Sequence, residues 1–161
     1  MRRKNIGKID YQIIDNVKVY QTPQVLKLFG LKPERFRQWI KRGFITPYRK
    51  ASGSGQTHSF TKNNLYVIGL FIHLCKSGLN RVVSSHFAQE IFYDLWVESL
   101  AYEEYARLII KLPDNPEKKR QRLKDIEAYV ETRKHIDLGE LKWAFILDVK
   151  QIIQDIDSKL S

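Results

Sequence analysis

The sequence has little cysteine and no long apolar segment. Its single cysteine, Cys75, excludes an intramolecular disulfide and a cysteine-rich metal cluster. No run of about 18 apolar residues occurs, so we expect no membrane-spanning helix. The first residues, MRRKNIGKIDYQ, are basic like a signal peptide but lack the apolar stretch that should follow. We therefore expect a cytoplasmic protein with no membrane partner.

The motifs of common enzyme classes are also missing. The chain has no Gly-rich phosphate loop and no nucleophile with a recognisable base. No metal-ligand spacing occurs among Cys75 and the histidines, which are His58, His73, His86 and His135. We predict a protein that is not an enzyme and holds neither a metal nor a cofactor.

Negative charge is scarce in the first third of the chain. The net charge of the 161 residues is +10; residues 1–62 hold 14 Lys+Arg against 3 Asp+Glu, and residues 63–161 hold 14 against 15. A basic segment joined to a neutral one is typical of a protein that meets a polyanion. Nucleic acid fits better than an anionic membrane, because no segment in this third pairs a long apolar face with a basic one.

The N-terminal part predicts a strand followed by a short helix. Residues 1–19 include KIDYQIIDNVKVY, whose β-branched and aromatic side chains indicate a short strand or an ordered arm. Thr22 can cap a helix, and Pro23 suits the first helical position because its missing N–H is not needed there. Gly30 can end this helix after about two turns in the left-handed conformation.

A second, amphipathic helix is predicted over Pro33–Arg42. Phe36, Trp39 and Ile40 fall at i, i+3 and i+4, so they can face a core together. Gly43 follows in the position that glycine favours after a helix. Two short helices joined by a glycine-containing turn predict a helix-turn-helix, whose second helix enters the major groove of DNA.

The other faces of this second helix are polar and strongly basic. A solvated surface is the usual interpretation of such a charge cluster, but the helix-turn-helix context favours contact with DNA. A glutamine can also hydrogen-bond adenine, although an exposed glutamine is equally ordinary. The candidate DNA-binding residues of this helix are Arg35, Arg37, Gln38, Lys41 and Arg42.

The next segment, FITPYRKASGSGQTHSFT, predicts a small hairpin that serves as a wing. Residues 44–45 and 58–60 can be its strands, with the Ser/Gly-rich tip between them. Arg49 and Lys50 on one side, and His58 near the other end, are candidates for contact with phosphates. A lone surface histidine is the alternative for His58.

A third helix is predicted over Leu65–Lys76. Thr61, Asn63 or Asn64 can cap its start, and Gly78 can end it.

Several short motifs follow one another between residues 19 and 90. They are Tyr20-Gln-Thr-Pro-Gln-Val25, Arg37-Gln-Trp39, Gly43-Phe-Ile45, Pro47, Arg49, and Gly55 through Phe60-Thr61 with Leu65. Their order and spacing resemble the winged DNA-binding domain of MerR-type transcriptional regulators. That family carries a start like YTxxEVA, a helix and turn like LRxWExxGLLxPxR, a wing end like GxRxYxxxDL, and a helix closing on GxSxxxI.

Four positions differ from the family pattern. His58 stands at the usual wing arginine, Phe60 replaces a tyrosine, and Asn64 replaces a capping aspartate. Lys32 stands where a small polar cap precedes the second helix, and its ammonium cannot accept an N–H bond. These differences keep the architecture of the family but not an identical set of phosphate contacts.

The resemblance implies a function and a set of partners. Arg37 would hold DNA from the second helix and Arg49 from the wing, while Thr22 would lie close to the backbone. The family pairs as homodimers and often acts with RNA polymerase by distorting a promoter, and its metal and redox sensors use C-terminal cysteines, which this chain lacks. The implied protein is a regulator of transcription that binds double-stranded DNA in the bacterial nucleoid.

Two alternatives to a regulator remain. One is an excisionase-like architectural or recombination-associated DNA-binding protein, which shares a similar wing and needs no effector. The other makes the C-terminal part a protein-interaction platform that the basic domain tethers to DNA.

Helical periodicity dominates beyond residue 80. Val82–Lys111 carries a broad apolar and aromatic helical face, although Tyr105–Leu112 can equally be a strand, and residues 116–134 resemble a charged helix. The tail places apolar residues at steps of 3, 4, 4, 3, 4 and 4, an eleven-residue repeat that favours a helix. A competing interpretation makes LKWAFILDV, residues 141–149, a strand and leaves only the last dozen residues helical.

The stripe of the tail suits a dimer seam or packing onto the aromatic face. Its residues are Leu138, Leu141, Phe145, Val149, Ile152, Ile156 and Leu160. The sequence thus predicts a mainly α-helical protein with an arm or strand over 1–19, a winged helix-turn-helix over 20–80, and a helical dimerisation or effector region over 81–161.

Overall fold

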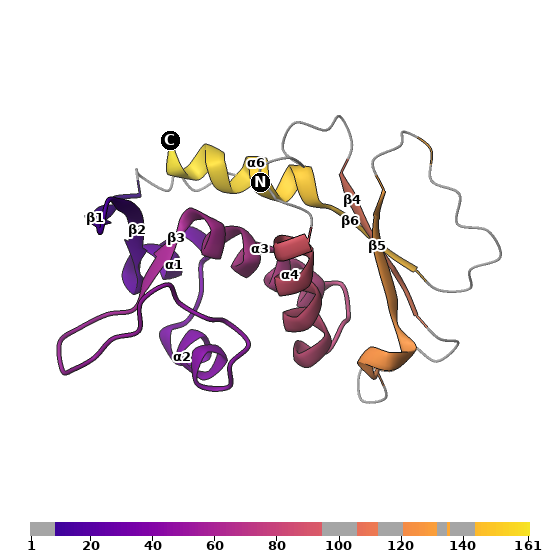
Figure 1. The fold of residues 1–161 in the computed structure, drawn as a ribbon, viewed down its shortest axis with the longest axis horizontal. Coiled ribbons are helices and arrows are strands. Elements are labelled where there is room, and N and C mark those ends of the chain that lie inside the picture. Colours follow the sequence, from indigo (N-terminus) through magenta and orange to yellow (C-terminus); the bar gives the residue numbers. More distant parts are fainter. Residues whose placement is uncertain (1–8, 95–105, 113–120, 132–134, 136–143) are drawn as a thin grey trace. The chain divides into compact units, whose positions relative to one another are not determined.

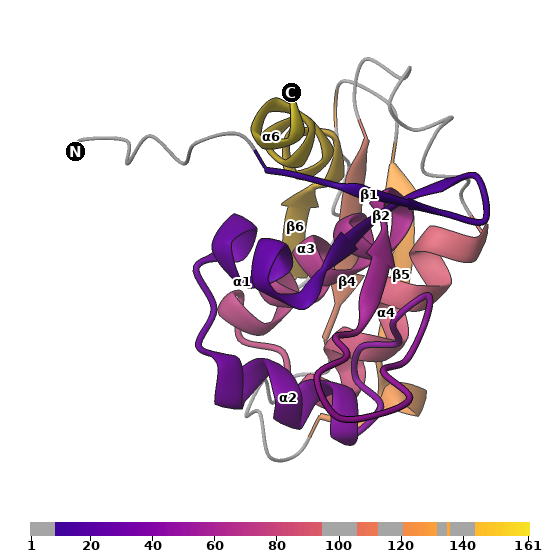
Figure 2. The same cartoon turned by 90° about the vertical axis from the view of Figure 1, so that its left-hand side faces the viewer.

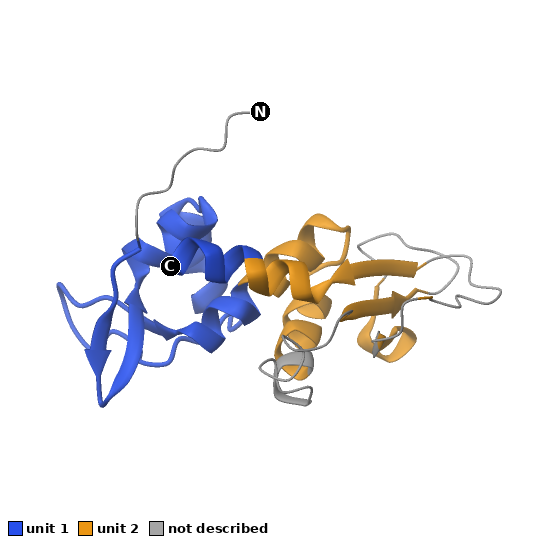
Figure 3. Cartoon of the chain, turned by 90° about the horizontal axis from the view of Figure 1, so that it is seen from above, with its two compact units in different colours: residues 1–68, 155–161 blue, residues 69–154 orange. Residues whose placement is uncertain are grey.

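The computed structural model describes residues 9–94, 106–112, 121–131, 135 and 144–161 (Figure 1). The chain divides into two compact units: unit 1 contains residues 1–68 and 155–161, and unit 2 contains residues 69–154 (Figure 3). Helices α3 (Lys62–Lys76) and α6 (Val149–Leu160) each contribute residues to both units.

The prediction of a mainly α-helical fold is wrong. The described residues are about 49% helical and 21% strand, with two small antiparallel sheets, so the fold is mixed α and β. Each unit contains one three-stranded sheet.

The sheet of unit 1 begins with a hairpin near the N-terminus. Strand β1 (Gln12–Ile14) pairs antiparallel with β2 (Val17–Gln21), and β2 pairs with β3 (Ser59–Thr61). The turn residues Asp15 and Asn16 have φ of 51° and 62°. Two left-handed residues match the right-handed twist of a tight hairpin, and Asp and Asn tolerate that conformation best after glycine. Figure 2 shows this hairpin in indigo.

Helices α1 (Thr22–Phe29) and α2 (Pro33–Lys41) follow as predicted, with one correction at the first cap. Gln21, not Thr22, occupies the N-cap of α1 and makes no side-chain capping bond. The Thr22 hydroxyl instead donates to the carbonyl oxygen of His58 at 3.4 Å. The start of α1 is therefore attached to a segment 36 residues further along the chain.

Gly43 ends α2 in the predicted manner. Its φ is 73°, and its N–H donates to the carbonyl of Ile40 at 3.0 Å. The N–H of Phe44 donates to the carbonyl of Trp39 at 2.9 Å. These paired bonds satisfy the last carbonyls of the helix and turn the chain sharply away from its axis.

Reciprocal hydrogen bonds begin α3. The Thr61 N–H donates to Asn64 Oδ1 at 2.9 Å, and the Asn64 N–H donates to Thr61 Oγ1 at 3.3 Å. This is the geometry of a capping box, with asparagine in the place of the usual glutamate or glutamine. Among the three predicted caps, the structure selects Thr61.

A buried core joins the sheet and helices of unit 1. The rings of Phe36 in α2 and Phe60 in β3 lie with centroids 5.6 Å apart. Val19 in β2, Val25 in α1 and Leu65 in α3 are fully buried. Because α2 buries one face in this core, its remaining faces are held outward.

Unit 2 contains α4 (Arg81–Asp94) and the sheet β5-β4-β6. Strand β4 (Arg107–Lys111) lies between β5 (Glu127–Glu131) and β6 (Ala144–Asp148), antiparallel to both. A single 3-10 turn, Leu123–Asp125, precedes β5. Over the described residues 121–131, this turn and β5 contradict the charged helix predicted over 116–134, and β6 contradicts a continuous tail helix. The strand alternatives are confirmed over Arg107–Lys111 and Ala144–Asp148, and α6 begins at Val149.

The apolar stripe predicted for the tail is split between strand and helix. Leu138 and Leu141 lie outside the described residues. Val149, Ile152 and Ile156 are buried within the chain, while Phe145 and Leu160 are partly exposed. Three residues of the stripe are therefore packed within the chain. Over the described part of the chain, no helix has the length and apolar content needed to cross a membrane.

Candidate nucleic-acid interface

Helix α2 presents a basic surface opposite its buried face. Phe36 and Trp39 are buried and Ile40 is partly buried, as the periodicity predicted. The predicted DNA-binding residues here are all exposed: Arg35, Arg37, Gln38 and Lys41 of α2, and Arg42 directly after it; the acidic Glu34 in the first turn of α2 is exposed as well. The structure thus brings every candidate of this segment to the surface, along α2 and its C-cap.

The positive charges of α2 have no acidic partner in the described ranges. Salt bridges there involve other cations, and the guanidinium of Arg35 lies over the Trp39 ring, 5.0 Å from its centroid. Stacking on an aromatic face orients an arginine without neutralising it. An external anion would therefore meet these cations without displacing a carboxylate of the described chain.

The wing differs from the predicted hairpin. We call residues 44–58, between α2 and β3, the wing loop. Residues 44–45 form no strand, because the Phe44 N–H caps α2; the Ile45 side chain is buried. Pro47 then offers no N–H to a neighbouring strand. Pairing is limited to one bridge, in which Arg49 and Ser59 exchange N–H bonds of 3.2 and 2.9 Å.

Gln21 fixes the returning side of the wing loop to the sheet. Its Oε1 accepts a hydrogen bond from the Thr57 hydroxyl at 2.6 Å, and its Nε2 donates to Ser59 Oγ at 3.1 Å and to Gln12 Oε1 at 3.0 Å. One side chain therefore connects β1, β3 and the wing loop. Sequence reasoning did not identify Gln21, because its partners Thr57 and Ser59 are 36 and 38 residues away.

An acidic residue lies beside the wing arginine. The carboxylate of Asp15, in the β1–β2 turn, accepts a hydrogen bond from the Arg49 guanidinium at 3.3 Å, and both side chains are mostly exposed. Lys50 is exposed as well. The β1–β2 turn, which sequence reasoning placed outside the site, therefore borders the wing cations.

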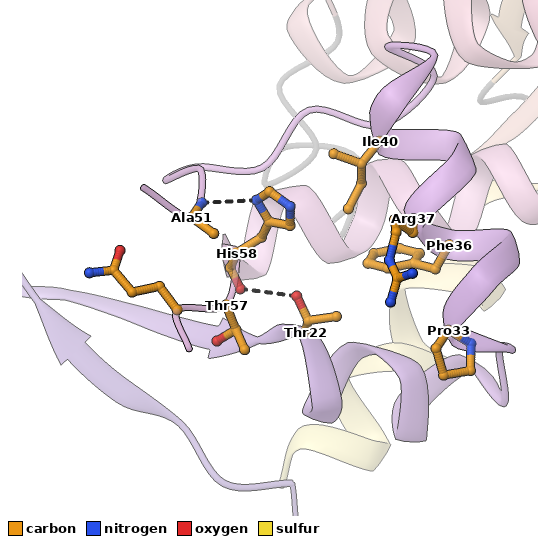
Figure 4. Close-up of a pocket in the computed structure, with 9 residues that line it drawn as sticks. Thr22, Pro33, Phe36, Arg37, Ile40, Ala51, Thr57 and His58 are labelled. Atoms are coloured by element: carbon orange, nitrogen blue, oxygen red, sulfur yellow. Dashed lines mark hydrogen bonds between the residues drawn. The ribbon is translucent and has the colours of Figure 1, made fainter. Parts of the chain in front are cut away.

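A groove separates α2 from the wing loop. Its volume is about 210 Å³. Figure 4 shows Pro33, Arg37 and Ile40 on the α2 side, facing Ala51 and His58 of the wing loop. The full lining consists of Thr22, Pro33, Phe36, Arg37, Ile40, Ala51, Gln56, Thr57 and His58.

His58 is held in one orientation within this groove. Its Nδ1 accepts a hydrogen bond from the Ala51 N–H at 3.1 Å, and its carbonyl accepts one from the Thr22 N–H at 3.1 Å. Because Nδ1 is an acceptor, the neutral imidazole carries its proton on Nε2 and can donate there. His58 is therefore an anchored donor, in contrast to the alternative of a lone surface histidine.

A polar cluster binds the C-terminal end of α6 to the start of α3, within unit 1. The Tyr66 hydroxyl donates to Asp157 Oδ1 at 2.6 Å, and Lys62 Nζ lies 2.9 Å from the same oxygen. Burial, together with the bond to Asp157, raises the pKa of Tyr66 to about 12. Burial lowers the pKa of Lys62, but hydrogen bonds with Tyr66 and Asp157 outweigh this effect and leave it raised.

The net charge of the chain resides in unit 1. Unit 1 holds 15 Lys+Arg and 5 Asp+Glu, whereas unit 2 holds 13 of each. Unit 1 therefore carries a net charge of +10 and unit 2 carries none. In the described ranges, no group of three or more metal-ligating side chains occurs.

Comparison with known proteins does not add a family to this description. No family model matches the chain, and no curated protein is detectably similar to it. The resemblance to MerR-type regulators therefore rests on the motifs quoted above and stays a prediction.

Proposed function

We propose that the chain binds double-stranded DNA through unit 1 and regulates transcription. Helix α2 enters the major groove, with Arg37 and Gln38 nearest to the bases and phosphates at its edge. Arg49 and Lys50 of the wing loop hold the flanking phosphates. The groups that position the protein on DNA are mostly cations, as expected when phosphates supply most of the affinity.

One observation carries this proposal: the cations of α2 are exposed, lack acidic partners in the described residues, and lie beside a second basic segment. Helix α2 and the wing loop form opposite walls of one groove. A solvated charge cluster explains neither this convergence nor the placement of the whole net charge in one unit.

We further propose that the protein acts as a homodimer and contacts RNA polymerase, as the MerR resemblance implies. Because Val149, Ile152 and Ile156 are buried within one chain, a dimer would be formed through other surfaces. Sedimentation of the free protein and of its DNA complex measures this directly, and a monomer in both states would contradict the proposal.

Arg37 and Arg49 are each proposed to contact one phosphate. We therefore expect Arg37→Ala and Arg49→Ala each to weaken DNA binding. Each should also reduce the slope of log affinity against log salt by about 0.9, the value for one phosphate contact. Affinity measured over a range of salt concentrations tests this. Lys124→Ala is the matched control, since Lys124 is an exposed cation of unit 2. Unchanged affinity and slope in both arginine variants would exclude the proposed surface.

Genome-wide footprinting then distinguishes regulation from the architectural alternative. Binding concentrated at promoters supports a regulator. Binding at attachment or recombination sites would instead favour an excisionase-like protein, and diffuse binding would favour a tether.

A further inference from the structure

The groove between α2 and the wing loop is lined by apolar and by polar side chains, and both elements contribute to each kind. We propose that it holds one deoxyribose-phosphate unit of the DNA backbone, with the sugar against its apolar floor and the phosphate at its polar rim. This inference rests on the proposed function, because it names the part of the duplex that the groove receives.

The floor suits the apolar side of a sugar. Pro33, Phe36, Ile40 and Ala51 contribute carbon atoms to the lining, and the volume is about 210 Å³. Pockets for drug-sized ligands usually exceed about 300 Å³. Phe36 is only 1% exposed, so its ring is covered and offers no face on which a base could stack. The groove therefore fits a small ring without an aromatic face.

The rim suits an anion. Arg37 supplies a guanidinium, and His58 supplies the Nε2–H that its bond to Ala51 leaves available, whereas the Thr57 hydroxyl already donates to Gln21. The imidazole of His58 points toward α2 (Figure 4). The lining includes no carboxylate, so an acidic side chain does not compete with a phosphate there. An apolar floor under a cationic rim matches the two chemical parts of a backbone unit.

The position of the groove agrees with this ligand. When a helix enters the major groove and a wing reaches the phosphates beside it, the backbone strand at the edge of that groove must pass between the two elements. The walls of this groove are those two elements. Gln21 and the Thr22–His58 bonds hold the wing wall in place before DNA arrives.

Filling the groove without changing its charge tests the proposal. Ala51→Phe and the smaller Ala51→Leu occupy the space of the sugar, whereas Ser54→Phe adds the same ring at an exposed wing position outside the lining. Thermal melting of each full-length variant verifies folding. The probe is a duplex recovered by in vitro selection with the unmodified chain, and hydroxyl-radical footprinting reports which deoxyriboses the protein covers.

We expect Ala51→Phe to weaken binding by about tenfold or more and to abolish protection of one sugar per bound protomer, with a smaller effect for Ala51→Leu and none for Ser54→Phe. Arg37→Met removes the cation proposed to bind the phosphate and does not fill the groove. Ethylation of the phosphate that contacts Arg37 should then no longer interfere with binding. Lys27→Met, which removes an exposed cation of α1 outside the lining, should preserve that interference.

The outcomes separate the two proposals. If folded Ala51→Phe and Ala51→Leu keep full affinity and the full protection pattern, while Arg37 and Arg49 remain necessary, the groove does not hold the backbone but DNA binding stands. If the unmodified chain binds no duplex in the selection, the proposed function fails, and this inference fails with it.

Discussion

Arg49 lies where two loops of unit 1 meet, and its guanidinium is already paired with Asp15 across 3.3 Å. A phosphate that binds Arg49 must replace this carboxylate or share the cation with it. Exposed ion pairs contribute little, up to about 1 kcal/mol, so the exchange is easy but not free. The Asp15 carboxylate also repels a nearby phosphate. Asp15 therefore lowers the affinity of the surface that Arg49 helps to form.

Asp15→Asn should strengthen DNA binding by up to about fivefold, because it frees Arg49 and removes a carboxylate that repels the phosphate. Asparagine tolerates the left-handed conformation of this turn, so the hairpin is expected to persist. Titration of a mixed-sequence duplex at low and high salt measures the change. Asp10→Asn removes an equal, exposed charge that is not bonded to Arg49 and is the control. Equal gains in both variants would show a general charge effect instead.

At the scale of elements, the start of α3 is both capped and bonded to α6. Thr61 and Asn64 form the cap, and Lys62 and Tyr66 contact Asp157 of α6. Tyr66, one turn inside α3, donates to Asp157 near the end of α6. The phenol is 5% exposed, so loss of its bond would leave a polar group without water. This contact supports the helix that follows the wing.

Tyr66→Phe should reduce the free energy of unfolding by about 1.5 to 3 kcal/mol, the usual range for a bond to a charged group. The pKa of Tyr66, about 12, exceeds the ordinary value of 10.0, so its contribution to stability is complete below pH 10 and is lost as the pH rises toward 12. Urea unfolding at neutral and alkaline pH measures both effects. Tyr48→Phe, at an exposed tyrosine, is the control. An unchanged alkaline loss in Tyr66→Phe would contradict this account.

The helices of unit 1 were predictable because their limits are local. Proline at the first positions and glycine after the last residue specify α1 and α2 within a few residues of sequence. The strands of unit 2 carry no such signal. Leu108, Ile109 and Ile110 in β4 are all fully buried, so the strand shows an unbroken apolar run without alternation. The spacing of apolar residues in β5 and β6 also fits a helix, because a short segment can match the helical period by chance. The sequence therefore favoured helices there.

The part of the candidate site that lies on one helix was predictable, and the part that depends on strand pairing was not. The basic face of α2 follows from helical spacing, which needs only ten residues of sequence. Asp15, Gln21 and the groove depend on pairing between β1, β2 and a wing 34 to 38 residues away. No local pattern reports such pairing, so these features became visible only in the folded chain.

At the scale of the whole molecule, all of the net charge lies in one unit and the chain returns to that unit at its end. Residues 155–161 belong to unit 1, and Ile156 is 3% exposed. The surface proposed to bind DNA is therefore supported by a segment that is remote in sequence and carries little of its charge.

Removal of residues 155–161 should destabilise unit 1 by at least about 2 kcal/mol, since it eliminates a buried isoleucine and the partner of Tyr66. DNA affinity should fall accordingly near the melting temperature, although the basic residues of α2 and the wing loop remain. Thermal melting and DNA titration of the shortened chain test this, with Lys159→Ala as the control for the one cation removed. Unchanged melting would show that α6 contributes nothing to unit 1.

The bond between Tyr66 and Asp157 also has a consequence for synthesis on the ribosome. The two residues are 91 positions apart, and Asp157 emerges second. At about 5 to 20 residues per second, unit 1 exists for roughly 5 to 20 seconds without its last segment. A nascent chain therefore carries its complete basic surface before that surface is fully stabilised. Products of premature termination that lack residues 155–161 would share this state permanently.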